Sequence, residues 1–196
     1  LFGIFDSAFT TATSRSTTKT RAEAISQVTK DSAQNAQSVG LSDDTQVTLQ
    51  SVESTTENFA AANVPVEEQA AMAGNVATAG LQAVATQPGA SDEQIAAASE
   101  EVVAKAVDGV EKAGTANLKE AYAALAKSPA DAMKDEATRA AFASAGVTPA
   151  TLVEKNSTKL KEKAAASEKF TAAEKSTLIP DIDTTTNSAV DELVAA

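Results

Sequence analysis

The stretch SDEQIAAASEEVVAKAVDGVEKAG, residues 91–114, decides the fold class of this 196-residue chain. It opens with a capping box. In this motif the Ser91 hydroxyl accepts a hydrogen bond from a backbone amide of the first turn, and the Gln94 side chain forms a hydrogen bond back to the backbone at the helix start. Apolar side chains then recur at helical spacing, at Ile95, Ala98, Val102, Ala106 and Val110. Gly114 stands where a C-terminal cap belongs. The stretch therefore predicts an amphipathic helix with a defined start and end.

The residues before this stretch predict three more helices. One is expected over residues 66–85. Residues 67–89 resemble residues 92–114 in their alanine and valine pattern, which suggests a helical hairpin. Another helix is expected over residues 14–39, closed by Gly40. A third begins near Ser42, because acidic residues in a first turn favour a helix start. Its apolar stripe has the spacing of a coiled-coil seam and consists of Leu49, Val52, Thr56 and Phe59.

The residues after the stretch contain two serine–proline or threonine–proline pairs that predict helix starts. A short helix is expected to carry Leu118, Tyr122 and Leu125. Ser128 and Thr148 are then predicted N-caps, each followed by proline at the first helical position, where the missing amide costs nothing. The last long helix is expected over residues 149–176, with a break at the sequence LIPDID and a short helix over residues 188–194.

These patterns together predict an all-α protein. Each proline falls at an expected helix boundary, and no long run alternates polar and apolar residues as a half-buried strand would. We expect an elongated bundle of about six to eight helices with close-packed, alanine-rich contacts. Its organisation is a Phe-rich N-terminal anchor over residues 1–13, the bundle over residues 14–176, and a C-terminal loop with a short helix over residues 177–196.

Small residues predict unusually close contacts between helices. Hydrophobic residues make up 43% of the chain but only 4% of it is aromatic, so the core must be thin. Ala73, Ala77 and Gly80 lie on one helix face, where they let a second helix approach. The surrounding segment, residues 69–91, carries no charge, but its glutamines and its few large side chains favour helix packing over a membrane span.

The charge distribution argues against nucleic acid as a partner. The net charge is −11, and phosphate binding needs clustered lysine and arginine. Residues 31–104 contain no basic residue, whereas residues 155–175 are rich in lysine. We expect the acidic stretch to form a solvated surface. An acidic face that docks on a basic face of another copy is the alternative.

Catalytic and metal-binding chemistry have little support. The chain has no histidine and no cysteine, which removes the usual nucleophile–base pairs, so we expect no enzyme activity and no cofactor. Asp181, Asp183 and Glu192 fall at positions 1, 3 and 12 of an EF-hand loop. However, Thr186 replaces the glycine of the sharp turn, and Pro180 interrupts the helix that should lead in. We therefore favour an ordinary capped loop over a calcium site.

The first nine residues hold three of the six phenylalanines. As a helix, this segment would form an apolar anchor made of Leu1, Phe2, Ile4, Phe5 and Phe9. The anchor can pack on the chain's own bundle, insert into another copy, or lie on a membrane surface. The scarcity of basic residues near it argues against the membrane, and so much apolar area needs some partner surface.

The function that we expect from these features is structural. The predicted protein is non-enzymatic and self-assembles through the anchor at the cell surface or outside the cell, with copies of itself as partner. The start at Leu1 instead of Met fits removal of a signal peptide. Two alternatives are association with a membrane or another envelope component, and a helical carrier of a small apolar ligand.

Overall fold

The computed structural model describes residues 27, 44–59 and 64–195. These residues form seven helices and no strand, which confirms the all-α bundle. The helices are α3 (Asp44–Glu57), α4 (Val66–Ala85), α5 (Asp92–Ala113), α6 (Leu118–Met133), α7 (Glu136–Ser144), α8 (Pro149–Ala166) and α9 (Ala172–Ala195). The predicted helix over residues 14–39 lies outside the described residues, apart from Gln27, which is helical.

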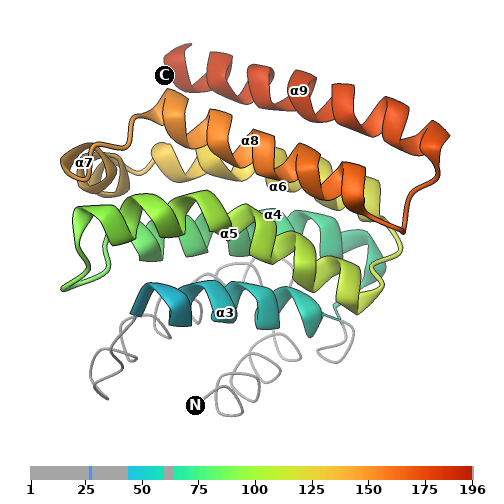
Figure 1. Ribbon diagram of the computed structural model, residues 1–196, viewed down its shortest axis with the longest axis horizontal. Helices are drawn as coiled ribbons and strands as arrows, with labels where there is room; N and C mark the ends of the chain where they lie inside the picture. Colours follow the sequence, from blue (N-terminus) through green and yellow to red (C-terminus); the bar gives the residue numbers. More distant parts are fainter. Residues whose placement is uncertain (1–26, 28–43, 60–63, 196) are drawn as a thin grey trace.

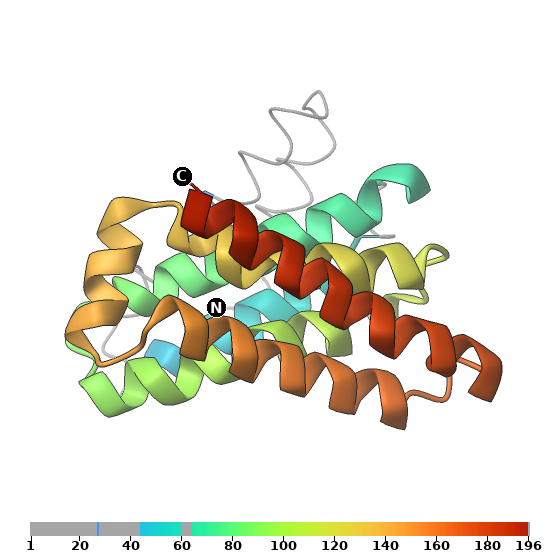
Figure 2. The ribbon, with the colours of Figure 1, turned by 90° about the horizontal axis from the view of Figure 1, so that it is seen from above.

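Six of the helices stack in two columns (Figure 1). One column consists of α3, α5 and α8, and the other of α4, α6 and α9. The most extensive contacts are those of α3 with α5 and of α4 with α6. Seen from above, α9 crosses the top of the stack over α6 and α8 (Figure 2). Along the chain, each of these six helices runs opposite to the one before it and lies in the other column. Helices within one column are therefore parallel.

The core between the columns combines a few large side chains with many small ones. Tyr122, Phe59, Phe142, Leu81 and Leu125 are the largest fully buried side chains. All four residues of the predicted stripe, Leu49, Val52, Thr56 and Phe59, are buried, although Phe59 lies two residues beyond the end of α3. Where the large side chains are missing, glycine and alanine bring helix backbones together, so dispersion between closely packed atoms replaces bulky apolar groups.

Three predicted caps are confirmed. The Gln94 amide donates to Ser91 Oγ at 3.2 Å, and the Ser91 amide donates to Gln94 Oε1 at 2.9 Å, so both halves of the capping box are present. Gly114 ends α5 in the left-handed conformation, with φ of 66°. Thr148 caps α8 through the Thr151 amide, and Pro149 opens the helix as expected.

The predicted N-cap at Ser128 is wrong, because α6 continues through Pro129 to Met133. A proline inside a helix removes the amide that would bond to the carbonyl four residues earlier, here that of Leu125. The Ser128 hydroxyl donates to this carbonyl at 2.7 Å and replaces the missing donor. The next helix, α7, starts instead at the Asp135 cap, whose carboxylate accepts the Thr138 amide at 2.8 Å.

Replacing Ser128 with alanine should lower the free energy of unfolding by about 1–2 kcal/mol, because the buried Leu125 carbonyl would lose its hydroxyl donor. Ser144→Ala is the matched control, since Ser144 makes the same kind of bond to Ala140 at an exposed position. Urea unfolding of both variants measures the difference. Equal losses in the two variants would contradict the compensating role of Ser128.

The predicted C-terminal boundaries are also wrong. The helix expected over residues 149–176 ends at Ala166, and the region expected to be a loop and a short helix belongs to α9, which runs from Ala172 through Pro180. The turn between them is closed by a second capping box. The Glu174 amide donates to Thr171 Oγ1 at 3.3 Å, and the Thr171 amide donates to Glu174 Oε2 at 2.9 Å.

Candidate functional site

The predicted anchor residues, Leu1, Phe2, Ile4, Phe5 and Phe9, lie outside the described residues. The structure does describe most of the bundle, so the hydrophobic residues exposed on its surface can be compared with the anchor. Among the described residues, Val66 and Val194 are the large hydrophobic side chains that are exposed, at 46% and 81%. These two lie singly, and single exposed hydrophobic residues are ordinary on protein surfaces. The exposed large hydrophobic residues of the described part of the chain thus form no extended apolar patch.

The small residues of α4 lie inside the bundle. Ala73 and Ala77 are fully buried. A Cβ added at Gly80 would stand 2.5 Å from a methyl group of Val52 on α3 and 3.1 Å from one of Val102 on α5. This position therefore brings three helices into contact. Within the part of the chain that the structure describes, no helix is long and apolar enough to cross a bilayer.

Asp181, Asp183 and Glu192 lie along α9, which rules out the EF-hand loop. Eleven residues of helix separate the first from the last by about 16 Å, so their carboxylates cannot share one ion. Asp183 Oδ1 instead accepts from Lys161 at 2.7 Å, and a Glu192 oxygen lies 3.9 Å from Lys134 Nζ. Across residues 44–59 and 64–195, no group of three acidic side chains gathers to hold a metal.

Part of the acidic stretch faces lysines of the same chain. On α8, Lys155 and Lys159 contact Glu100 and Glu101 of α5, at 2.6 and 3.0 Å. Lys163 pairs with Asp108 one turn further on. Because both sets of residue numbers rise together, this ladder of ion pairs matches the parallel arrangement of α5 and α8. Here, matching of acidic and basic faces occurs within one chain.

Glu53 on α3 joins two lysines of α5. Its carboxylate accepts from Lys105 at 2.9 Å and also from Lys112. The Glu53 side chain is only 17% exposed. Burial alone would raise the pKa of Glu53, but the hydrogen bonds from Lys112 and Lys105 outweigh it and hold the pKa below the ordinary value. Glu53 therefore links α3 to α5 as an anion.

Replacing Glu53 with glutamine should lower the free energy of unfolding at pH 7 by about 1–2 kcal/mol. The pKa of Glu53 is lower in the folded protein than its ordinary value of 4.5 in the unfolded chain. The stabilisation by the Glu53 carboxylate is therefore complete above pH 4.5 and is lost as the pH falls below this value. The difference between the wild type and Glu53→Gln should therefore shrink on acidification. Urea unfolding at several pH values measures it, and a difference independent of pH would contradict the charge-based origin.

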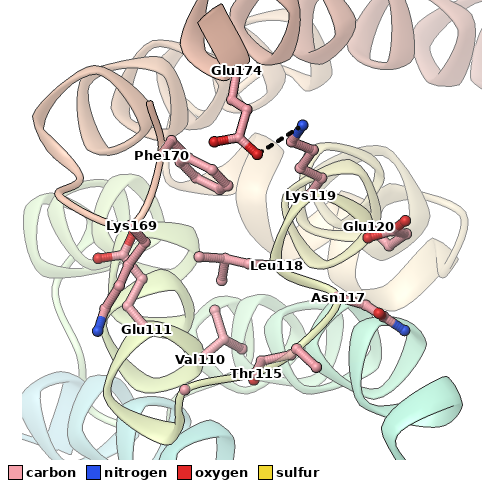
Figure 3. A pocket seen from close by; sticks show the side chains of 12 residues that line it. Val110, Glu111, Thr115, Asn117, Leu118, Lys119, Glu120, Lys169, Phe170 and Glu174 are labelled. Carbon is pink, nitrogen blue, oxygen red and sulfur yellow. Dashed lines mark ion pairs between the residues drawn. The ribbon is translucent and has the colours of Figure 1, made fainter. Parts of the chain in front are cut away.

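A cavity of about 570 Å³ lies between the α5–α6 turn and the α8–α9 turn (Figure 3). Its walls combine apolar and charged residues, which are Val110, Glu111, Gly114, Thr115, Ala116, Asn117, Leu118, Lys119, Glu120, Lys169, Phe170 and Glu174. Figure 3 shows Phe170, Leu118 and Val110 around the open space, whereas Asn117 and Glu120 point away from it. The volume is in the range of sites for small molecules.

Two residues of the cavity wall, Glu111 and Phe170, are supported from behind by Tyr122. The Tyr122 hydroxyl donates to Glu111 Oε1 at 2.8 Å, and its ring meets that of Phe170 edge to face, with 5.4 Å between centroids. Tyr122 is fully buried. Burial raises the pKa of its hydroxyl well above the ordinary value of 10, and the hydrogen bond to Glu111 adds to this effect. Tyr122 is therefore a hydrogen-bond donor and not a base.

Tyr122 should stay protonated in the folded protein at pH values where a free tyrosine ionises. It is the single tyrosine of the chain, so phenolate absorbance reports on it alone. A raised folded pKa contributes stability below pH 10 that is lost as the pH rises above this value. We expect half-ionisation near pH 10 in denaturant, and in buffer only together with unfolding. Ionisation near pH 10 with intact helical circular dichroism would contradict the burial of the hydroxyl.

The opposite rim of the cavity is closed by an ion pair. Lys119 Nζ lies 3.3 Å from Glu174 Oε1, shown by the dashed line in Figure 3. The other oxygen of Glu174 accepts from the Thr171 amide and hydroxyl. These contacts lower the pKa of Glu174, with the backbone hydrogen bond from Thr171 as the largest cause. Both charges of this rim are thus already paired within the chain.

The cavity arises from residues that sequence reasoning did not bring together. Tyr122 and Leu118 were predicted on a helix, but Glu111, Lys169 and Phe170 were not linked to them. One local signal was present, because Thr171 and Glu174 match the capping-box pattern that places the α8–α9 turn. No protein-family model matches the chain, and no curated protein is significantly similar to it in sequence.

Proposed function

We propose that this chain is a non-enzymatic structural protein that associates with copies of itself through its Phe-rich segment, residues 1–9, at the cell surface or outside the cell. The described bundle serves as the body that this segment links to a neighbour. Most of the described lysines pair with acidic residues of neighbouring helices of the same chain.

The observation that carries the proposal is the uneven distribution of apolar side chains. The described surface exposes the large hydrophobic residues Val66 and Val194 alone. In contrast, residues 1–9 contain three phenylalanines, a leucine and an isoleucine. Buried aromatic anchors supply most of the binding energy in protein interfaces. Residues 1–9 are therefore the strongest candidate for an association surface in this chain.

Sedimentation velocity over a range of concentrations tests the proposal. The full chain should form oligomers or larger particles as concentration rises, and the variant Phe2→Ser/Phe5→Ser/Phe9→Ser should stay monomeric. The matched control is Val66→Ser/Val194→Ser, which removes the exposed hydrophobic residues of the described surface and should assemble like the wild type. Assembly of the triple variant would overturn the role of the anchor.

The same variants distinguish the lipid-associated alternative. A full chain that remains monomeric at all concentrations overturns self-assembly. If that monomer co-floats with anionic liposomes and the triple serine variant does not, the anchor binds a membrane surface instead. Flotation of neither protein would leave the anchor packed on its own bundle, which predicts that the triple variant is less stable than the wild type.

A further inference from the structure

From the cavity between the α5–α6 and α8–α9 turns, we infer that this protein binds a small organic cation with an apolar body, such as an aryl- or alkylammonium ion, with the carboxylate of Glu111 as its charge partner. This site is independent of the proposed self-assembly, which concerns residues 1–9. It also differs from the predicted carrier of an apolar ligand, because charged side chains make up much of the cavity wall.

Glu111 is the partly buried carboxylate at the cavity that makes no ion pair with a described residue. It is half-buried, and its one side-chain hydrogen bond comes from the neutral hydroxyl of Tyr122. No lysine or arginine of the described residues lies within 4 Å of it. A partly buried carboxylate gains most from an ammonium ion, because charge-assisted hydrogen bonds are about twice as strong as neutral ones. Tyr122 holds this carboxylate in place from behind.

The other acidic and basic groups at the cavity do not offer the same contact. Glu174 is paired with Lys119 and bonded to Thr171. Glu120 is exposed and points away from the open space in Figure 3. Lys169 is exposed and makes no ion pair with a described residue. Because Lys119 is paired with Glu174, Lys169 is the one unpaired cation among the described residues that line the cavity, and a ligand must compete with it.

The apolar side of the cavity suits the body of such a ligand. Phe170 and Leu118 face the open space, and Val110 of α5 lies beside it (Figure 3). An aromatic ring next to a carboxylate is a recurrent environment for ammonium groups, since the face of the ring attracts a cation and the carboxylate neutralises it. The Phe170 ring is held by its edge-to-face contact with Tyr122, so the two recognition groups share one support.

Titration calorimetry with benzylammonium, benzyl alcohol and phenylacetate tests the inference on the full chain. Benzylammonium should bind more tightly than its neutral and anionic analogues. Glu111→Gln, which keeps an acceptor for the Tyr122 hydroxyl, should raise the Kd for benzylammonium at least fivefold. The matched control Glu120→Gln should change it less than twofold, and Lys169→Gln should lower it, because a competing charge is gone.

Several outcomes would overturn the cation site. One is equal affinity of the wild type for benzylammonium and benzyl alcohol. Another is tighter binding of phenylacetate than of benzylammonium, which would mean that the site prefers anions. If Glu111→Gln and the wild type have the same Kd for benzylammonium, Glu111 is not part of the binding site. If Glu111→Gln does not fold, the comparison of the three probes on the wild type decides. Amide chemical shifts of Gly114 and Phe170 should move on binding, and shifts confined to other helices would place the ligand elsewhere.

Discussion

Replacing Gly109 with alanine should lower the free energy of unfolding by about 3 kcal/mol or more. A Cβ at this position would stand 1.8 Å from Thr56 Oγ1, 2.4 Å from the Glu53 carbonyl oxygen and 2.9 Å from the Glu57 amide nitrogen. Two of these three atoms belong to the backbone of α3, which cannot move aside as a flexible side chain would. The clash therefore outweighs the roughly 1 kcal/mol that alanine gains over glycine in a helix.

Two other glycines provide matched controls for this substitution. At Gly74 the added Cβ would come no closer than 3.0 Å, to the Ala124 carbonyl oxygen, so Gly74→Ala should change stability by less than about 1 kcal/mol. Gly114 has open space around it but a φ of 66°, so Gly114→Ala should cost about 1 kcal/mol through backbone strain. In urea unfolding, the free energy of unfolding of Gly109→Ala should be far lower than that of Gly74→Ala or Gly114→Ala. Equal stability of the three variants would contradict the close approach of α3 and α5.

The dependence of α3 on Gly109 follows from the composition of that helix. Its buried face includes the hydroxyl residues Thr48, Ser51, Thr55 and Thr56 beside Leu49 and Val52. Small polar side chains bury little apolar area, so the helix can be held firmly only where its backbone lies close to α5. The link from Glu53 to Lys105 and Lys112 lies directly beside this contact. Close packing and an ion pair thus act at the same point.

The parts of the fold that could be predicted from the sequence are those with local causes. The capping box at Ser91 and the glycine at position 114 act within a few residues, and both stand as predicted. The two helix-interior prolines were misplaced because the structure compensates for them, locally at Pro129 and through tertiary packing at Pro180. At Pro129 a neighbouring serine supplies the missing donor, and packing on α6 and α8 keeps α9 helical through Pro180. Propensity alone cannot reveal such support.

The cavity could not be predicted because its residues meet only after the helices have stacked. Glu111 and Phe170 are separated by more than fifty positions in the chain, yet both contact Tyr122. Nothing in the local pattern of either residue distinguishes it from an ordinary surface glutamate or core phenylalanine. The ladder between α5 and α8 had a visible signal, since Lys155, Lys159 and Lys163 recur every four residues. Its acidic partners depend on which helix lies alongside.

Replacing Tyr122 with alanine should lower the free energy of unfolding by about 3–5 kcal/mol, the second large effect that we expect. The side chain is fully buried in the core, and its removal would leave a void next to Phe170. The same change removes the hydroxyl that holds Glu111, so benzylammonium binding should weaken as well. Urea unfolding and calorimetry on one preparation measure both effects.

Tyr122→Phe separates the two roles of this residue. It keeps the ring and the edge-to-face contact with Phe170 but removes the hydrogen bond to Glu111. The loss of stability should then be about 1 kcal/mol, because Glu111 is only half-buried and water can replace the hydroxyl. A loss as large as that of Tyr122→Ala would mean that the hydroxyl, and not the ring, supports the core. Unchanged stability in Tyr122→Ala would contradict the burial of the ring, and with it the common support of Glu111 and Phe170 at the cavity.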